Sequence, residues 1–305
     1  MQNPDFIKEH ISEVLKHIDV ESIRARKFRV GVDTINASAS VADPFLFEQL
    51  GIETFYLNNT PSGQFAHKPE PLKENLSELA HLVREKKLDL GFAQDPDADR
   101  LVLVNEKGEV ISEECTLALA VENVLSKNPG RDIAINLSTS EMSAEIARNY
   151  GGKCLRTKVG EGNVVNGILR NGAIIGGEGN GGVIYPAING ARDSFTGMAL
   201  VLELLAERGK TLGECLAKLP KYSMKKDKWK IAGKDLHQIY AKLTGRFPKA
   251  KTNEEDGLRL VFPDNSWIHL RPSNTEPIIR LIGEAKDEEI IEKLFEEARL
   301  TLDEK

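Results

Sequence analysis

The most constraining feature of this 305-residue sequence is a short repeat whose two copies lie one hundred residues apart. Ile-Asn-Ala-Ser-Ala-Ser at residues 35–40 matches Ile-Asn-Leu-Ser-Thr-Ser at residues 135–140. Each copy follows an apolar stretch of strand length, precedes a helix-like segment, and leads through glycine to another short strand. The serines are typical of helix caps. Strand, capped helix and strand, found twice, predict two related α/β domains with mixed sheets.

The rest of the pattern divides the chain into four parts. Apolar residues at helical spacing follow Pro4. The turn-forming sequence Lys-Asn-Pro-Gly at residues 127–130 marks a boundary between domains. The last part of the chain contains short apolar segments and ends in an amphipathic helical pattern. That last part predicts a smaller α+β C-terminal domain. We expect a linker helix, two α/β domains and this C-terminal domain at residues 1–20, 21–127, 128–222 and 223–305.

Two segments close to the last boundary also carry expectations. Residues 195–208 predict a strong helix, with Asp193 or Ser194 as its cap and Gly209 as its end. The lysine-rich residues 221–230 follow, and their basic composition predicts a linker, with a short strand expected at residues 229–231.

Composition narrows the class of protein. The net charge of -6 argues against a nucleic-acid-binding surface. The cysteines are odd in number and widely spaced at Cys115, Cys154 and Cys215, which suits buried thiols in a reducing compartment. No apolar run reaches the length of a membrane span and the start does not resemble a signal peptide. We therefore expect a cytoplasmic protein without nucleic-acid or membrane partners.

Three carboxylates at alternate positions stand beside an arginine in Asp-Pro-Asp-Ala-Asp-Arg, residues 95–100, here called the metal loop. A hard divalent cation takes oxygen ligands, and a bend in the backbone would bring Asp95, Asp97 and Asp99 to one point. Arg100 is well placed to bind a phosphate beside such a cation, because its guanidinium can donate two parallel hydrogen bonds to phosphate oxygens. The alternative is an acidic turn on a solvated surface.

An EF-hand calcium site is excluded at this loop. The acidic residues match positions one, three, five and twelve of such a site, but the sixth position needs glycine and is Arg100 here. The flanking residues 88–93 and 101–104 are short apolar runs that predict strands, where an EF-hand requires helices.

A glycine-rich sequence, Gly-Gly-Glu-Gly-Asn-Gly-Gly, forms what is here called the glycine loop at residues 176–182. Its glycines let the backbone approach a ligand, and Glu178 and Asn180 supply an acceptor and an amide. A nucleotide-binding loop would open a helix, whereas residues 183–186 continue as extended chain. We expect an uncharged polyol as ligand, because Glu178 can accept from two neighbouring hydroxyls; a flexible hairpin is the alternative.

Arg-Pro-Ser-Asn-Thr-Glu-Pro at residues 271–277, here called the phosphate loop, joins two expected strands. The Arg271 guanidinium with nearby hydroxyl, amide and backbone N–H groups can cradle a phosphate. A polar hairpin turn is the alternative, but it leaves the arginine and the paired prolines unexplained. Lys158, in the polar segment 157–163, could steady a phosphate or move a proton, although an exposed lysine needs no special role.

The order of these three loops, one in each domain, resembles the α-D-phosphohexomutase family over essentially the whole chain. In that family the first loop holds magnesium, the second reads sugar hydroxyls and the third grips the substrate phosphate. The resemblance implies that Mg²⁺ binds Asp95, Asp97 and Asp99. It places Arg100 beside the transferring phosphoryl group and Lys158 near the reacting hydroxyl, as catalytic residues. The substrate contacts that it implies are Glu178, Asn180, Arg271, Ser273, Asn274 and Thr275.

The sequence departs from the family pattern in two ways. Many members have serine at the position of Asn180 and histidine at that of Gly182, and the form seen here is similar to the phosphomannomutase/phosphoglucosamine mutase branch. The family also has four domains, the first of which carries a phosphorylated serine, usually in a Ser-His-Asn-Pro loop. No such loop occurs in these 305 residues. We therefore expect the chain to correspond to domains two, three and four.

The resemblance implies a parent enzyme that moves phosphate between O1 and O6 of a hexose or hexosamine phosphate through a bound bisphosphate. The sugar is mannose, glucosamine or glucose. The isolated chain is expected not to turn over, for lack of the phosphoserine, and to bind magnesium weakly, because that phosphoserine helps to complete the ligand shell of the metal. A naturally shortened, non-catalytic sugar-phosphate-binding protein is the alternative.

Overall fold

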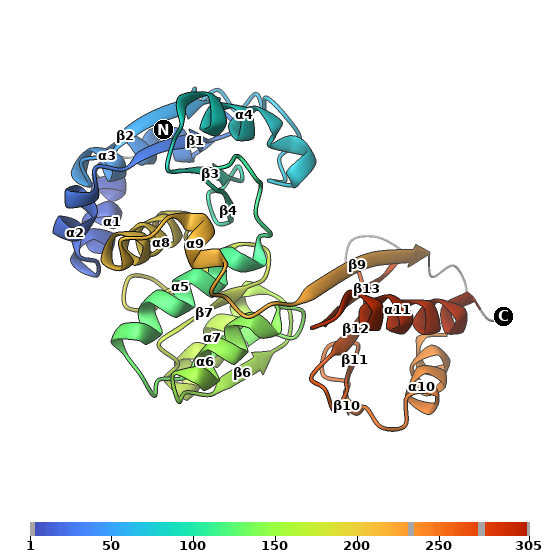
Figure 1. Cartoon of the computed structure of the whole chain (residues 1–305). Helices are drawn as coiled ribbons and strands as arrows, with labels where there is room; N and C mark the ends of the chain where they lie inside the picture. The colour runs from blue at the N-terminus through green and yellow to red at the C-terminus, as the bar shows by residue number, and fades with distance from the viewer. Residues whose placement is uncertain (1–3, 231–234, 274–277, 304–305) are drawn as a thin grey trace.

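The structure is a computed structural model that describes residues 4–230, 235–273 and 278–303 (Figure 1). Its helices are α1 (Pro4–Lys16), α2 (Val20–Arg26), α3 (Ala39–Gln49), the 3₁₀ helix η1 (Lys73–Asn75), α4 (Ser77–Lys86), α5 (Glu114–Lys127), α6 (Glu141–Asn149), α7 (Glu161–Asn171), α8 (Ser194–Arg208), α9 (Leu212–Leu216), α10 (Leu236–Arg246) and α11 (Glu288–Asp303). Its strands are β1 (Arg29–Asp33), β2 (Glu53–Leu57), β3 (Leu90–Gln94), β4 (Leu101–Val104), β5 (Ile133–Asn136), β6 (Cys154–Thr157), β7 (Ile175–Glu178), β8 (Gly182–Ile184), β9 (Ser223–Lys230), β10 (Lys251–Asn253), β11 (Leu258–Val261), β12 (Trp267–Pro272) and β13 (Ile278–Ala285).

Two sheets of the same design form the first two units of the molecule. The order is β2-β1-β3-β4 in one and β6-β5-β7-β8 in the other. In each sheet three strands run parallel and the last strand returns antiparallel through a short loop. This common topology confirms the two related α/β units with mixed sheets. In both units the returning turn carries one of the predicted loops, the metal loop before β4 and the glycine loop before β8.

The two α/β units share one hydrophobic core. It runs from Ile11 in α1 through the inner faces of both sheets to Leu219. Helices α5 and α8 pack on each other, and α8 also packs on α2, so the gold and green helices in Figure 1 lie between the two sheets. Smaller clusters of buried side chains cover the outer faces of the sheets beneath α4 and α7. Because the core is continuous, the loops between the two units are held in a fixed relation.

The C-terminal domain is a separate antiparallel sheet with two helices, which confirms the expected smaller α+β domain. Its strands lie in the order β10-β11-β12-β13-β9, and its core is distinct from that of the α/β units. The expected linker at residues 221–230 is wrong for most of its length, because Ser223–Lys230 form β9, which pairs along β13. This strand stands at the edge of the sheet and its lysines reach acidic partners, as Lys225 does with Glu292.

Polar side chains join the C-terminal domain to the second α/β unit. Ser140 Oγ donates to Glu284 Oε1 at 2.5 Å, and the Glu141 amide donates to Glu284 Oε2 at 2.7 Å. His269 Nδ1 lies 2.8 Å from Ser138 Oγ.

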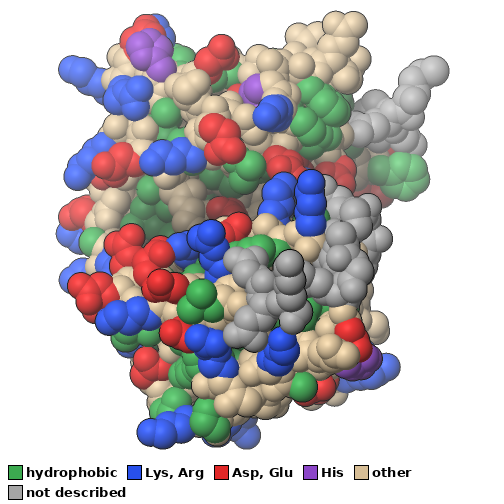
Figure 2. Space-filling model, turned by 90° about the vertical axis from the view of Figure 1, so that its right-hand side faces the viewer, with side chains coloured by type: hydrophobic (Ala, Val, Ile, Leu, Met, Phe, Trp, Pro, Cys, Tyr) green, Lys and Arg blue, Asp and Glu red, His purple; other side chains and the backbone are tan. Residues whose placement is uncertain are grey.

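The outer face of the C-terminal domain carries interspersed acidic and basic side chains (Figure 2). Within the three described ranges, none of the helices combines the length and the apolar character needed to cross a bilayer.

Candidate functional site

The metal loop turns sharply between β3 and β4. Ala98 adopts a left-handed backbone conformation (φ 61°), and its amide donates to the Asp95 carbonyl at 3.0 Å. The amides of Asp99 and Arg100 both donate to Asp95 Oδ1, at 3.1 and 3.0 Å. The turn brings one carboxylate oxygen each of Asp95, Asp97 and Asp99 within 4.8 Å of the others.

Burial and mutual repulsion set the charge of these carboxylates. Burial would raise the pKa of Asp95, but hydrogen bonds from Arg100, whose Nε lies 2.5 Å from Asp95 Oδ2, outweigh it and lower that pKa. Burial and the Asp95 charge raise the pKa of Asp99 to about 7, and the same two causes raise that of Asp97. Asp99 Oδ1 is buried without a hydrogen-bond partner. Crowded carboxylates with an unused buried oxygen are a donor set that fits Mg²⁺.

The glycine loop lies directly against the metal loop. It is a tight hairpin between β7 and β8, and the amide of Leu101, the residue after Arg100, donates to the Gly181 carbonyl at 3.1 Å. Glu178 is 4% exposed, and its Oε1 accepts from Asn136 Nδ2 at 2.8 Å and from the Gly160 amide at 2.9 Å. These two hydrogen bonds hold the Glu178 carboxylate in one orientation and in its acceptor form.

Arg192, which precedes α8, was not predicted from the sequence. Its guanidinium pairs with Asp99 Oδ2 of the metal loop and donates to Glu178 Oε2 of the glycine loop at 2.8 Å. No motif marks this arginine, because it stands in a polar loop between β8 and α8. The Asp193 cap that follows it is the nearest signal, since the cap fixes where the chain enters the helix.

The phosphate loop connects to the other loops through Asp256. Arg271 Nε is buried without a hydrogen-bond partner and lies 3.5 Å from Asp256 Oδ2, while Asp256 Oδ2 accepts from the Val159 amide at 2.8 Å. Val159 stands next to Lys158, which is exposed. The amide of Ser273 donates to the Ile278 carbonyl at 2.9 Å. Two further predicted phosphate contacts, Asn274 and Thr275, lie outside the described residues.

A continuous set of contacts therefore joins the predicted loops. We call it the contact path: Asp99, Arg192, Glu178, Gly160, Val159, Asp256 and Arg271. The path starts in the first α/β unit, crosses the second and ends in the C-terminal domain.

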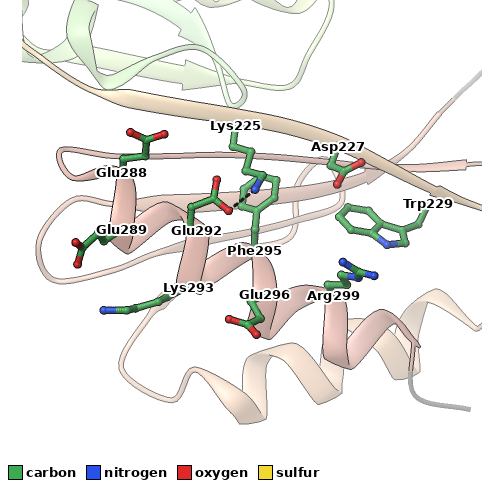
Figure 3. A pocket seen from close by; sticks show the side chains of 10 residues that line it. All are labelled: Lys225, Asp227, Trp229, Glu288, Glu289, Glu292, Lys293, Phe295, Glu296 and Arg299. Carbon is green, nitrogen blue, oxygen red and sulfur yellow. Dashed lines mark hydrogen bonds and ion pairs between the residues drawn. The ribbon is translucent and has the colours of Figure 1, made fainter.

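A sizeable surface cavity of the C-terminal domain lies outside this path. It has a volume of 680 Å³ and is formed by β9 and α11, with Trp229, Phe295 and acidic residues of α11 around it (Figure 3). None of the predicted site residues lines it. The Lys225–Glu292 ion pair drawn in Figure 3 joins β9 to α11 across this cavity. The pair therefore holds together two elements of the C-terminal domain.

Comparisons with known proteins agree with the resemblance seen in the loops. Family models described as phosphoglucomutase/phosphomannomutase alpha/beta/alpha domain II, alpha/beta/alpha domain III and C-terminal domain match residues 8–108, 113–222 and 228–301. A phosphoglucomutase/phosphomannomutase of Thermococcus kodakarensis is 39% identical over 95% of this chain and 64% of its own length. A probable phosphoglucosamine mutase of Methanopyrus kandleri is 34% identical over 94% of this chain and 64% of its own length.

A solved structure extends this to the fold. The phosphoglucomutase/phosphomannomutase family protein of Burkholderia thailandensis superposes with a TM-score of 0.85 at 28% identity, over 97% of this chain and 64% of that one. The chain thus spans 64% of the length of the curated relatives named above. By its sequence and by its fold, this chain belongs to the phosphoglucomutase/phosphomannomutase family.

Proposed function

We propose that this chain is the metal-, sugar- and phosphate-binding part of a phosphohexomutase that interconverts hexose or hexosamine 1-phosphate and 6-phosphate through a bisphosphate. The single observation that carries the proposal is the contact path, which brings loops from three domains together. Each loop offers a different chemistry: carboxylates for a divalent cation, Glu178 and Asn180 for hydroxyls, and the Arg271 guanidinium, whose Nε has no hydrogen-bond partner, for a phosphate.

The residues of the metal loop would act at the transferring phosphoryl group. Asp95, Asp97 and Asp99 would hold Mg²⁺, which supplies charge neutralisation at a phosphoryl oxygen when bound. Arg100, half-buried and fixed by Asp95, would orient the same group through its remaining N–H groups. The exposed amine of Lys158 would accept or return the proton of the reacting hydroxyl.

The other two loops would hold the rest of the substrate. Glu178 and Asn180 would bind the sugar hydroxyls, while Arg271 and Ser273, with Asn274 and Thr275 as further predicted contacts, would grip the distal phosphate. Such a grip at a distance orients either end of a sugar bisphosphate toward the metal loop. Since these 305 residues contain no Ser-His-Asn-Pro sequence, we expect them by themselves to bind substrate without multiple turnover.

A calorimetric titration with sugar phosphates tests this proposal. Mannose 6-phosphate, glucosamine 6-phosphate and glucose 6-phosphate are each titrated into the chain and into Arg271→Ala. Removing the guanidinium should weaken binding by about 1.5–3 kcal/mol, the scale of a hydrogen bond to a charged group. The order of affinities among the three sugars then identifies the preferred substrate.

Arg246→Ala is the matched control for this titration. Arg246 lies in the same domain and pairs with Glu297 on the surface, away from the contact path. Its loss should leave the affinity unchanged. Equal binding by Arg271→Ala and the parent chain would remove the phosphate role from this loop.

A further inference from the structure

Arg192 lies where the metal loop and the glycine loop meet. One N–H group pairs with Asp99 Oδ2 and another donates to Glu178 Oε2 at 2.8 Å. A third acid holds the arginine in place, because Glu161 Oε1 accepts from the Arg192 amide at 2.6 Å and Glu161 Oε2 lies 3.8 Å from Nε. The side chain is only 17% exposed. A largely buried guanidinium thus bridges two loops to which we assign different ligands.

Gly182 provides the space for this arginine. A Cβ atom at Gly182 would lie 2.3 Å from Cδ and 3.0 Å from Cγ of Arg192. The backbone of Gly182 is in a conformation open to other residues, so close approach alone excludes a side chain, mainly to Arg192 and less closely to Asn180 Oδ1 at 3.1 Å. A side chain there and the observed placement of Arg192 are mutually exclusive, which makes Gly182 and Arg192 a matched pair.

We propose that Arg192 is a positioning residue that couples the metal loop to the glycine loop. Its charge neutralises Asp99 in the absence of a divalent cation, and its second N–H group holds Glu178 in place for the sugar. A divalent cation must compete with the guanidinium for Asp99, because both attract the same carboxylate. Removal of the charge should therefore tighten cation binding, while Glu178, left without its charged donor, should bind the sugar less well.

The predicted changes in cation affinity and sugar affinity have opposite signs. Simple damage to the site would instead weaken the binding of both ligands. Both halves of the inference rest on the proposed function, the metal half on its cation site and the sugar half on its sugar site. The two halves therefore need separate titrations.

The metal titration uses Mg²⁺ alone, and Mn²⁺ as a second probe, with calorimetry on the 305-residue chain. Arg192→Met should bind either cation more tightly, on the order of tenfold, as expected for loss of one unit charge at contact distance in a partly buried site. Arg192→Lys keeps the charge and should stay close to the parent. Gly182→Ala, which displaces the arginine, should shift affinity in the direction of Arg192→Met.

Gly245→Ala is the matched control for the glycine variant. Gly245 lies in α10, and a Cβ atom there meets nothing within 4 Å. This variant should leave cation and sugar-phosphate affinities unchanged.

The sugar titration uses glucose 6-phosphate without metal. Arg192→Met should bind it at least about fivefold more weakly, since a hydrogen bond from a charged donor is lost. Arg192→Lys should not restore this affinity, because an ammonium group cannot bridge Asp99 and Glu178 as the planar guanidinium does.

Two results would overturn the coupling role. One is unchanged or weaker cation binding in a folded Arg192→Met, and the other is equal loss of both ligands. If Arg192→Met fails to fold, cation affinity in Gly182→Ala that matches the parent would overturn it. A parent chain that binds cations but no sugar phosphate would instead refute the proposed function, while the cation titration still decides the role of Arg192.

Discussion

His269 shows how a single buried side chain holds the C-terminal domain in place. It is fully buried in β12, with Nδ1 2.8 Å from Ser138 Oγ of the second α/β unit and Nε2 2.6 Å from the Asp256 carbonyl. Burial lowers the pKa of His269 from 6.5 to about 4, with the charge of Arg259 adding to the effect. The imidazole is therefore neutral at pH 7, and acid should weaken this contact.

The stability of the chain should depend on pH through His269. Between pH 6.5 and 4 the unfolded chain binds a proton at this histidine that the folded chain does not, so the free energy of unfolding falls as the pH drops. The full contribution is about 3 kcal/mol. Urea unfolding of the parent and His269→Asn across this range should give a smaller pH slope for the variant. Parallel curves would show that His269 does not titrate as described.

The two repeat copies show the limit of prediction for individual residues. The serines of both copies were expected as helix caps, and Ser140 is one, since its Oγ accepts from the Met142 amide at 3.0 Å. Its counterpart Ser40 is not, because it lies inside α3 and its hydroxyl donates to the Ala37 carbonyl at 2.5 Å. Ser38, which precedes α3, makes no side-chain cap hydrogen bond, and its hydroxyl donates to the Pro96 carbonyl of the metal loop at 2.6 Å. The helix begins two residues earlier in the first copy than in the second, so the repeat sequence alone does not decide which serine caps it.

Among the elements, α8 packs against helices and strands of both α/β units. It begins at its predicted cap Asp193 and ends at the predicted Gly209. Glu203, 2% exposed on this helix, accepts from the Asp19 amide at 2.5 Å and from Asn123 Nδ2 at 2.6 Å, and pairs with Lys127 at 2.6 Å. This carboxylate thereby ties the segment between α1 and α2 to α5.

Replacement of Glu203 should destabilise the fold. Glu203→Gln removes a charged acceptor and turns an amide toward groups that are themselves donors, which should cost about 1.5–3 kcal/mol of unfolding free energy in urea. Glu207→Gln is the matched control, because Glu207 pairs with the same Lys127 at 2.9 Å but is 33% exposed. Its effect should stay below about 0.5 kcal/mol. Equal losses in the two variants would contradict a special role for the buried carboxylate.

The elements were predictable where apolar periodicity and punctuation agree, as in α8 and in β4 at residues 101–104. An element was not predictable where its composition indicates a loop or linker instead of a helix or strand. Ser223–Lys230 carry four lysines, yet they form the long edge strand β9, because the pairing with β13 comes from the chain fold and the lysines face solvent or acidic partners. Charge on an edge strand is common in sheets and hides the strand from composition.

At the scale of the whole molecule, the sequence indicated which loops carry chemistry but not how they connect. The three loops were recognisable because their residue types are unusual and ordered along the chain. Arg192 and Asp256, which join them, stand in ordinary polar loops more than sixty residues apart. Their roles depend on the shared core of the α/β units and on the docking of the C-terminal domain. The roles of the individual site residues, and the domain bounds expected from the sequence, stay predictions.

If metal and sugar phosphate occupy one site built by three domains, a paramagnetic cation bound there must act on the phosphorus nuclei of the substrate. ³¹P NMR of glucose 1,6-bisphosphate is recorded with the chain and a small amount of Mn²⁺, a paramagnetic substitute for Mg²⁺. We expect protein-dependent broadening of both phosphate signals, stronger for one, that is lost in both Asp95→Asn and Arg271→Ala. Broadening that is absent although both ligands bind, or that survives these substitutions, would contradict it.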